Sequence, residues 1–178
     1  DGTSVSQCTR FSGYFAASEL IAISGDCDDN PAACGIGCNP GNIEIGTKWK
    51  GMSPSTDKRF VAFESPEYGI RAMARVLRNY QRKHKLNTLR DIIHRWAPPS
   101  DNNPTQKYVD YVSSKTNIQH NQPIKLDDDK ILSNIIKAMI SFENGQAQVY
   151  DDHIIQKGVL LEKESKLKSS FLHKLSTS

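Results

Sequence analysis

The most constraining feature of this chain is an apolar segment that ends in Glu143-Asn144-Gly145. Three consecutive aspartates, 127–129, precede it and suit the positive end of a helix dipole, and Asn-Gly is a helix stop signal. Apolar side chains recur between these limits at helical spacing and form a broad stripe: Ile131, Leu132, Ile135, Ile136, Met139, Ile140 and Phe142. The sequence therefore predicts a buried helix that delivers one carboxylate, Glu143, at its end.

The position of Glu143 suggests acid chemistry. A carboxyl group beside Phe142 on such a helix should be partly desolvated, which raises its pKa and suits it to donate a proton. The alternative is a Glu at a helix end that lies in solvent. This stretch alone leaves both interpretations open.

The length and net charge of the chain limit the class of protein to which it can belong. With 178 residues, 37% hydrophobic residues and a net charge of +3, it is expected to form one globular domain with an ordinary core. A charge this small does not indicate a nucleic-acid binder. No apolar run is long enough to span a bilayer.

All four cysteines, Cys8, Cys27, Cys34 and Cys38, lie in the first 38 residues. An even number clustered in a loop-rich segment favours two disulfides and hence an oxidising compartment, with the connectivity open. The alternatives are a zinc site, against which the absence of paired C-x2-C knuckles argues, and free thiols.

The rest of the chain predicts mainly helices and one small hairpin. Ile43-Glu44-Ile45 and Arg59 to Phe63 alternate apolar and polar residues, with a turn-rich link at 51–55, as in an antiparallel hairpin. Ser65-Pro66-Glu67 is a helix start, and that helix should run to about residue 84 with most of its arginines in solvent. Further helices are expected over 10–23, 88–96, around Tyr108 and Tyr111, and over 151–158, before a packing arm or frayed helix over 162–178.

The chain lacks the motifs of several common enzyme classes. The chain has no Gly-rich phosphate loop after a strand, no H-E-x-x-H and no G-x-S-x-G, and its five histidines lack metal-ligand spacing. Carboxylates, asparagines and aromatic residues remain, which are the groups that grip sugars and cleave glycosidic bonds. Neither a metal nor a cofactor is expected.

Four further glutamates are candidates for a second carboxylate. Glu44 alternates with Ile43 and Ile45, so it should point away from the core, toward a cleft or toward water. Glu64 and Glu67 flank a helix start, and Glu19 lies inside the predicted first helix. Asn42, in the segment Asn39-Pro40-Gly41-Asn42, either serves a plain turn or reaches a sugar from a rigid rim.

Five segments in order resemble a family of phage virion-associated proteins. That family shows an N-N-P-G-N-I segment, W-x-G, F-x-S-P-E-x-G-I-R-A, R-W-A-P-P and a late E-N-G. The matching segments cover about residues 35–158: 35–43, 49–51, 59–72, 86–100 and 143–145. Cys38 stands where the family pattern has Asn, and the added cysteine-rich segment and longer C-terminal arm look like those of an exported bacterial enzyme.

The family is similar in turn to the lysozyme superfamily and to bacterial glucosaminidases. In those relatives the acid Glu ends a helix that precedes the N-P-x-N-I turn, whereas Glu143 follows it, as in a circular permutation. Glu19 does precede the turn, but Leu20-Ile21-Ala22 continues its helix, so Glu143 is preferred. Among exported relatives, the chain is similar to the lysozyme of predatory bacteria that prefers deacetylated peptidoglycan.

These observations predict a mainly α (α+β), lysozyme-like domain over 39–160, with a disulfide-linked N-terminal segment (1–38) and a C-terminal arm (161–178). Its expected activity is glycoside hydrolysis of peptidoglycan strands by an exported, monomeric enzyme. Glu143 would be the general acid and Glu44 the second carboxylate. Asn39 and Asn42 would line the rim and Tyr108 would form an aromatic wall, while Trp96 is expected in the core. The alternatives are a lytic transglycosylase, if no second carboxylate faces the cleft, and a non-catalytic peptidoglycan-binding module.

Overall fold

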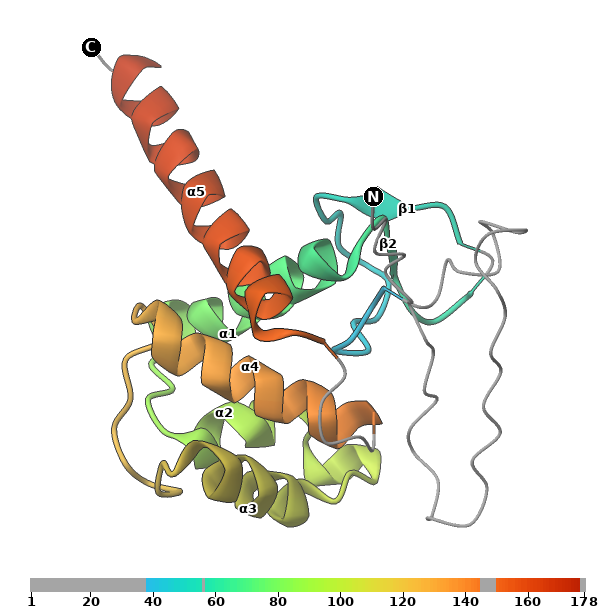
Figure 1. The fold of residues 1–178 in the computed structure, drawn as a ribbon, viewed down its shortest axis with the longest axis vertical. Coiled ribbons are helices and arrows are strands. Elements are labelled where there is room, and N and C mark those ends of the chain that lie inside the picture. The colour runs from blue at the N-terminus through green and yellow to red at the C-terminus, as the bar shows by residue number, and fades with distance from the viewer. Residues whose placement is uncertain (1–37, 56, 145–149, 177–178) are drawn as a thin grey trace.

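A computed structural model of the chain describes residues 38–55, 57–144 and 150–176. The expected fold class is confirmed, because the structure is mainly helical with one small antiparallel sheet (Figure 1). Its elements in order are β1 (Met52–Ser53), β2 (Ala62–Phe63), α1 (Pro66–His84), α2 (Leu89–Trp96), the short 3-10 helix η1 (Pro99–Asp101), α3 (Thr105–Thr116), α4 (Asp129–Asn144) and α5 (Asp152–Ser176).

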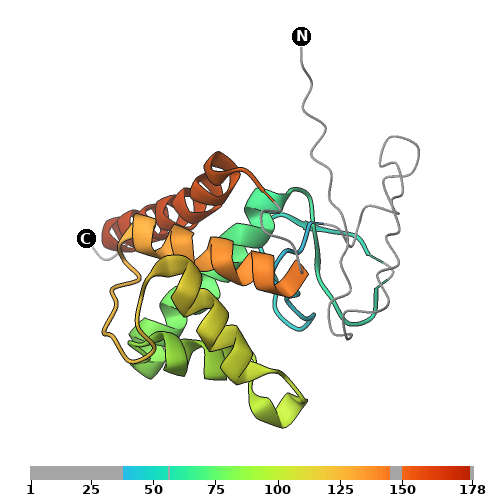
Figure 2. The ribbon, with the colours of Figure 1, turned by 60° about the horizontal axis from the view of Figure 1, so that its bottom comes forward.

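The core forms where α4 packs between the other helices. The predicted apolar stripe is confirmed, since Leu132, Ile135, Ile136, Met139 and Ile140 are all almost fully buried. Helix α4 packs against α3 on one side and α5 on the other, and α1 packs against α5 (Figures 1 and 2). Burial of this stripe removes several large side chains from water and is the main force that fixes the end of α4.

The hairpin differs in detail from the expected one. Glu44 does pair with Phe60 in an isolated antiparallel bridge, as predicted. The regular sheet, however, joins Met52 to Phe63 and Ser53 to Ala62. Its first strand therefore lies inside the segment 51–55, which the sequence predicted to be a turn-rich link. Gly51 makes this possible, because it adopts a positive φ of 76° just before β1 and a Cβ there would collide with the ring of Tyr68.

The turn at residues 39–43 is fastened to α1 through two glycines. A Cβ on Gly69 would lie 2.4 Å from the carbonyl oxygen of Cys38, and a Cβ on Gly41 would lie 2.7 Å from Cγ of Met73. Both distances are shorter than real side chains allow, so only glycine permits this approach. The turn therefore has a fixed position relative to the helices.

The C-terminal helix is longer than expected. Instead of a short helix over 151–158 and a separate arm, α5 is continuous from Asp152 to Ser176. Gly158 lets it cross close to α1, because a Cβ there would lie 2.5 Å from Cγ2 of Ile70. The arginine face of α1 also differs from expectation, since Arg78 is buried and pairs with the buried Glu162 of α5 at 2.6 Å.

Some expectations fall outside the described residues. These include the helix predicted over 10–23, Glu19, and the cysteines Cys8, Cys27 and Cys34. Cys38 is buried and is not a free thiol. Because the other three cysteines lie outside the described residues, the two expected disulfides and their connectivity stay predictions. None of the helices described in 38–55, 57–144 and 150–176 has the length and apolar character that a membrane crossing requires.

Candidate functional site

Glu143 lies at the end of α4 and is only 8% exposed. Its Oε1 accepts hydrogen bonds from the indole Nε1 of Trp96 at 3.1 Å and from the hydroxyl of Tyr108 at 2.9 Å. Its Oε2 accepts a bond from Nδ2 of Asn42 at 3.1 Å. The carboxyl group is thus almost completely removed from bulk water, and both of its oxygens are held by protein donors.

The three donors come from three separate elements. Asn42 belongs to the 39–43 turn and has a left-handed backbone (φ 51°), which asparagine tolerates better than most residues. Trp96 is the last residue of α2, and Tyr108 lies in the first turn of α3. The Phe142 ring stacks on that of Tyr108, with ring centroids 4.0 Å apart.

Burial raises the pKa of Glu143, because desolvation penalises its charged form. The bonds from Trp96, Tyr108 and Asn42 lower the pKa in opposition, but desolvation is the largest effect. The expectation of a partly desolvated carboxyl group at the end of this helix is therefore confirmed. A raised pKa is what a general acid near neutral pH requires.

The contacts also indicate which oxygen would carry the proton. Oε1 accepts two bonds, one of them from an indole that can only donate. Oε2 accepts a single bond, from an amide whose oxygen and nitrogen can exchange places by a flip. A flipped Asn42 would accept the Oε2 proton, so the protonated acid is compatible with this site. Asn42 and Trp96 are only partly buried, so they connect the carboxyl group with the surface.

Asn39 does not line a rim, contrary to expectation. Its side chain is buried, and Nδ2 donates to the carbonyl oxygens of Ile43 and Val61, each at 2.8 Å. Its Oδ1 accepts the backbone N–H of Ile43, also at 2.8 Å. Asn39 therefore ties the turn to the strand region and holds Asn42 in place, with its polar atoms already used.

Glu44 is placed on an exposed surface by the hairpin. Its Oε1 lies 2.8 Å from Nε and 2.7 Å from a terminal nitrogen of Arg59, and its side chain is 59% exposed. The alternation predicted both Ile43 and Ile45 to face the core, but only Ile43 packs against it, and Ile45 is 53% exposed. Glu64 is likewise exposed, and Glu67 lies in the first turn of α1.

Two aromatic residues have roles that differ from their expected ones. Tyr108 is fully buried and contacts Glu143 through its hydroxyl, so it supports the acid rather than forming an open wall. Trp96 packs against the core as expected, but its indole nitrogen also contacts Glu143, which the sequence did not reveal. The sequence did show that Trp96 lies at a helix end, because Ala97-Pro98-Pro99 follows it, and this was the available signal for a role beyond core packing.

The chain is similar to a known phage protein. Protein P5 of Pseudoalteromonas phage PM2 is 41% identical over 136 residues, which cover 72% of this chain and 81% of the phage protein. The chain belongs to the P5 family. No model in a search of protein-family models matches the sequence.

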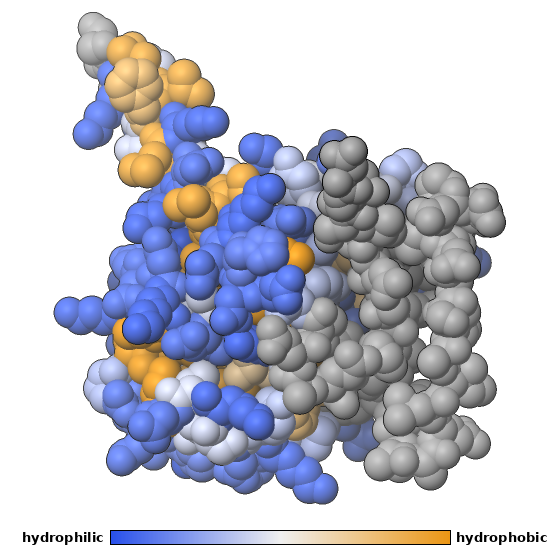
Figure 3. Space-filling view, in the orientation of Figure 1, coloured by the Kyte–Doolittle hydropathy of each residue, from blue (hydrophilic) through white to orange (hydrophobic). Residues whose placement is uncertain are grey.

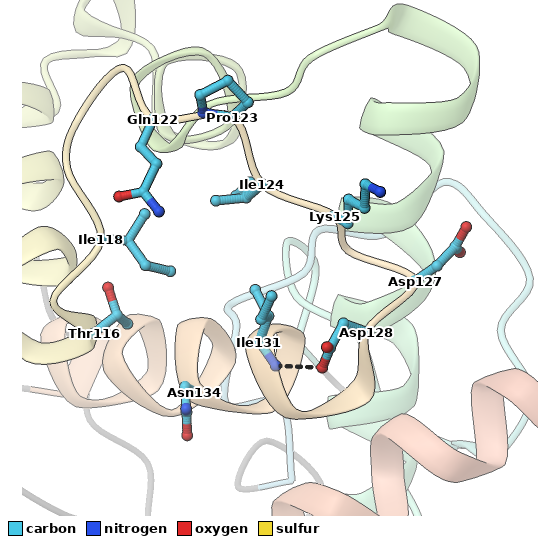
Figure 4. A pocket seen from close by; sticks show the side chains of 10 residues that line it. All are labelled: Thr116, Ile118, Gln122, Pro123, Ile124, Lys125, Asp127, Asp128, Ile131 and Asn134. Carbon is cyan, nitrogen blue, oxygen red and sulfur yellow. Dashed lines mark hydrogen bonds between the residues drawn. The ribbon is translucent and has the colours of Figure 1, made fainter.

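This P5-family chain has a hollow that contains none of the residues of the Glu143 site. It measures about 460 Å³ and is lined by the 116–128 region and the start of α4, with Ile118, Ile124 and Ile131 turned toward one another (Figure 4). Its carboxylates already have structural partners. Asp127 pairs with Arg82 at 2.7 Å, and Asp128 caps α4 by accepting the N–H of Ile131 at 3.1 Å.

Metal binding finds no support in the described part of the chain. No three His, Cys, Asp or Glu side chains come together there as a metal site would require.

Proposed function

We propose that this chain is a peptidoglycan glycoside hydrolase of lysozyme type, in which Glu143 is the general acid. The observation that carries the proposal is the environment of the Glu143 carboxyl group at the end of α4. It is 8% exposed, its pKa is raised, and it accepts hydrogen bonds from three side chains. A buried group of this kind, next to partly exposed polar side chains, is a candidate site on physical grounds.

The arrangement suits both stages of acid catalysis. Before the reaction, desolvation keeps the Glu143 proton available at a pH where an exposed Glu would have lost it. The proton passes from Oε2 to the glycosidic oxygen as the bond from that oxygen to the anomeric carbon breaks. The carboxylate that remains is stabilised by Trp96, Tyr108 and Asn42, which bind the ionised form more strongly than the neutral one.

A lytic transglycosylase is the second candidate. The observation that favours it is the placement of Glu44, which is bound to Arg59 on an exposed surface and is not hydrogen-bonded to Glu143. Of the candidate second carboxylates that the structure describes, none bonds to the Glu143 cluster. With one carboxyl group, the substrate's own hydroxyl rather than water would attack the anomeric carbon, and Glu143 would accept that hydroxyl's proton.

The wild-type chain and Glu143→Gln should be incubated with native and with chemically deacetylated sacculi, and the released fragments weighed. Glu143→Gln keeps the shape of the side chain and removes its proton. Glu164→Gln, at an exposed position of α5, is the matched control. We expect release by the wild type and the control, and none by Glu143→Gln.

Each outcome has a distinct meaning. Fragments with a free reducing end support hydrolysis, and anhydro ends, lighter by one water, support transglycosylation. Faster release from deacetylated sacculi would extend the proposal to that substrate. Equal activity of Glu143→Gln would contradict the role of Glu143. If no protein releases fragments from either substrate but all bind sacculi, the chain is a binding module.

A further inference from the structure

The outer half of α5 extends beyond the body of the molecule (Figure 1). Nε of Arg71 donates to the hydroxyl of Ser165 at 3.3 Å, and Ser165 is the last residue of α5 that is partly buried. Every residue over 166–176 is exposed. A helical segment of that length is marginally stable in water alone, and helices in proteins are normally stabilised by packing of an apolar face.

One face of this helix carries large apolar side chains. Leu160, Leu167 and Phe171 are 48%, 64% and 64% exposed, and together with Glu164 they are spaced four, three and four residues apart. This is the spacing of a coiled-coil seam with one polar member. Figure 3 shows hydrophobic surface along the extended helix. The same face remains open toward the N-terminal half of α5, where Gln156 and Lys157 are exposed.

The charges on the seam point to one kind of partner. Glu164 lies within the apolar face, and Lys168 lies one turn further on, at its edge. In an antiparallel pair of α5 helices centred between Ser165 and Lys166, Glu164 of each copy lies within one residue of the level of Lys168 of the other. Leu160 then comes level with Phe171 of the second copy. A parallel pair would instead place Glu164 beside Glu164 of the second copy, which like charges disfavour.

We propose that the α5 seam, defined as Leu160, Glu164, Leu167, Lys168 and Phe171, binds a second copy of this chain as an antiparallel helix pair. The sequence led us to expect a monomer, and the proposed dimer is independent of any catalytic activity. The exposed apolar side chains and the stems of the two charged residues offer roughly 1,000 Å² in total, the lower edge of specific interfaces, so the dimer should be weak.

An anionic lipid surface is the competing partner, since the outer half of α5 carries Lys166, Lys168 and Lys174. A carboxylate in the middle of the apolar face argues against it, because Glu164 would be pressed toward negative headgroups. A second copy neutralises that charge with Lys168. The charge pattern therefore favours self-association.

Sedimentation velocity on the full chain over a range of concentrations tests the proposal. We expect concentration-dependent dimerisation that Phe171→Glu abolishes and that Ser169→Glu, on the opposite face of the same helix, leaves unchanged. Glu164→Lys and Lys168→Glu should each raise the dimer Kd about tenfold, and the double variant, which exchanges the two charges, should return it near the wild-type value.

Three outcomes would overturn the proposal. A chain that stays monomeric at every concentration has no such interface, whether or not it sediments with phosphatidylserine-containing vesicles. A dimer that survives Phe171→Glu uses another surface. A double variant as weak as its parents rules out the antiparallel register. Because all of these positions are exposed, circular dichroism should show that each variant folds.

Discussion

The indole N–H of Trp96 donates to Oε1 of Glu143 over 3.1 Å and thereby joins the last residue of α2 to the end of α4. An indole nitrogen donates a hydrogen bond and cannot accept one, so this contact stabilises the ionised form of Glu143 relative to the protonated form. It works against desolvation, which favours the neutral acid. The protonation state of Glu143 is consequently set by two opposed local effects.

This contact offers a direct measurement of the Glu143 pKa. The chain has two tryptophans, so a Trp49→Phe background leaves Trp96 as the sole indole fluorophore. We expect its fluorescence to titrate with a midpoint above the ordinary Glu value of about 4.3, and glycan release to fall as pH rises through that midpoint. The transition should vanish in Glu143→Gln. A midpoint at or below the ordinary value would contradict the raised pKa.

The same shift predicts a pH dependence of stability. Since the folded pKa of Glu143 is raised, folding is favoured by proton binding, and this contribution is fully present below the unfolded pKa of about 4.3. It is lost as pH rises through the folded pKa. The free energy of unfolding of the wild type should therefore fall relative to that of Glu143→Gln across this window, and the difference should then level off. Urea denaturation at a series of pH values measures it, and a difference of the opposite sign would contradict the assignment.

Asn42 and Asn39 should separate activity from stability. Asn42→Gly keeps the left-handed backbone and removes the bond to Glu143, so we expect a small change in stability and a roughly tenfold fall in kcat. Asn39→Ala removes three hydrogen bonds to the backbone of Ile43 and Val61, although the Ile43 carbonyl still accepts the N–H of Val61, and should cost about 2–4 kcal/mol of folding free energy. Thermal denaturation and glycan release measured on both variants test the contrast. The distinction fails if Asn42→Gly unfolds the protein.

The sequence predicted those parts of the site that depend on local pattern. The apolar stripe and the Asn-Gly stop were sufficient to place Glu143 at the end of a buried helix, because periodicity and stop signals are local properties. The bond from Asn42 to Glu143 spans 101 residues of sequence and could not follow from any local pattern. The indole contact of Trp96 was missed for the same reason.

Two errors have a common physical cause. Alternation along 43–45 predicted that Ile43 and Ile45 face the core and Glu44 faces away, but Ile45 is 53% exposed, and periodicity cannot say whether the other side meets a site or water. Similarly, the charged, Ser-rich composition of residues 162–178 suggested a packing arm or a frayed helix, although no Pro or Gly after Gly158 interrupts α5. In both cases the sequence gives the local conformation and not what surrounds it.

Glu44 itself provides a sharp test of mechanism. Because it is exposed and bound only to Arg59 in the described contacts, Glu44→Gln should change the unfolding free energy by less than about 1 kcal/mol. We also expect glycan release to stay near the wild-type rate. Arg59→Gln, which removes the same ion pair from the other side, is the matched control. If Glu44→Gln alone abolishes release while both variants stay folded, Glu44 is the second carboxylate after all.

The buried ion pair between α1 and α5 should be the most sensitive polar contact in the fold. Arg78 is 2% exposed and donates to Glu162 at 2.6 Å, to Asp129 at 2.7 Å and to the Leu126 carbonyl at 2.9 Å. Arg78→Met leaves the fully buried Glu162 without its closest cation and should cost about 3–5 kcal/mol.

The double variant Arg78→Met/Glu162→Leu should recover much of that loss, because it removes the stranded charge together with its partner. Arg82→Met is the control, since its pair with Asp127 is largely exposed and should contribute less than about 1 kcal/mol. Chemical denaturation of the wild type, Arg78→Met, Glu162→Leu and the double variant gives the coupling energy between Arg78 and Glu162. Simple additivity of the two single changes would show that the pair, despite its short distance and complete burial, does not act as a unit.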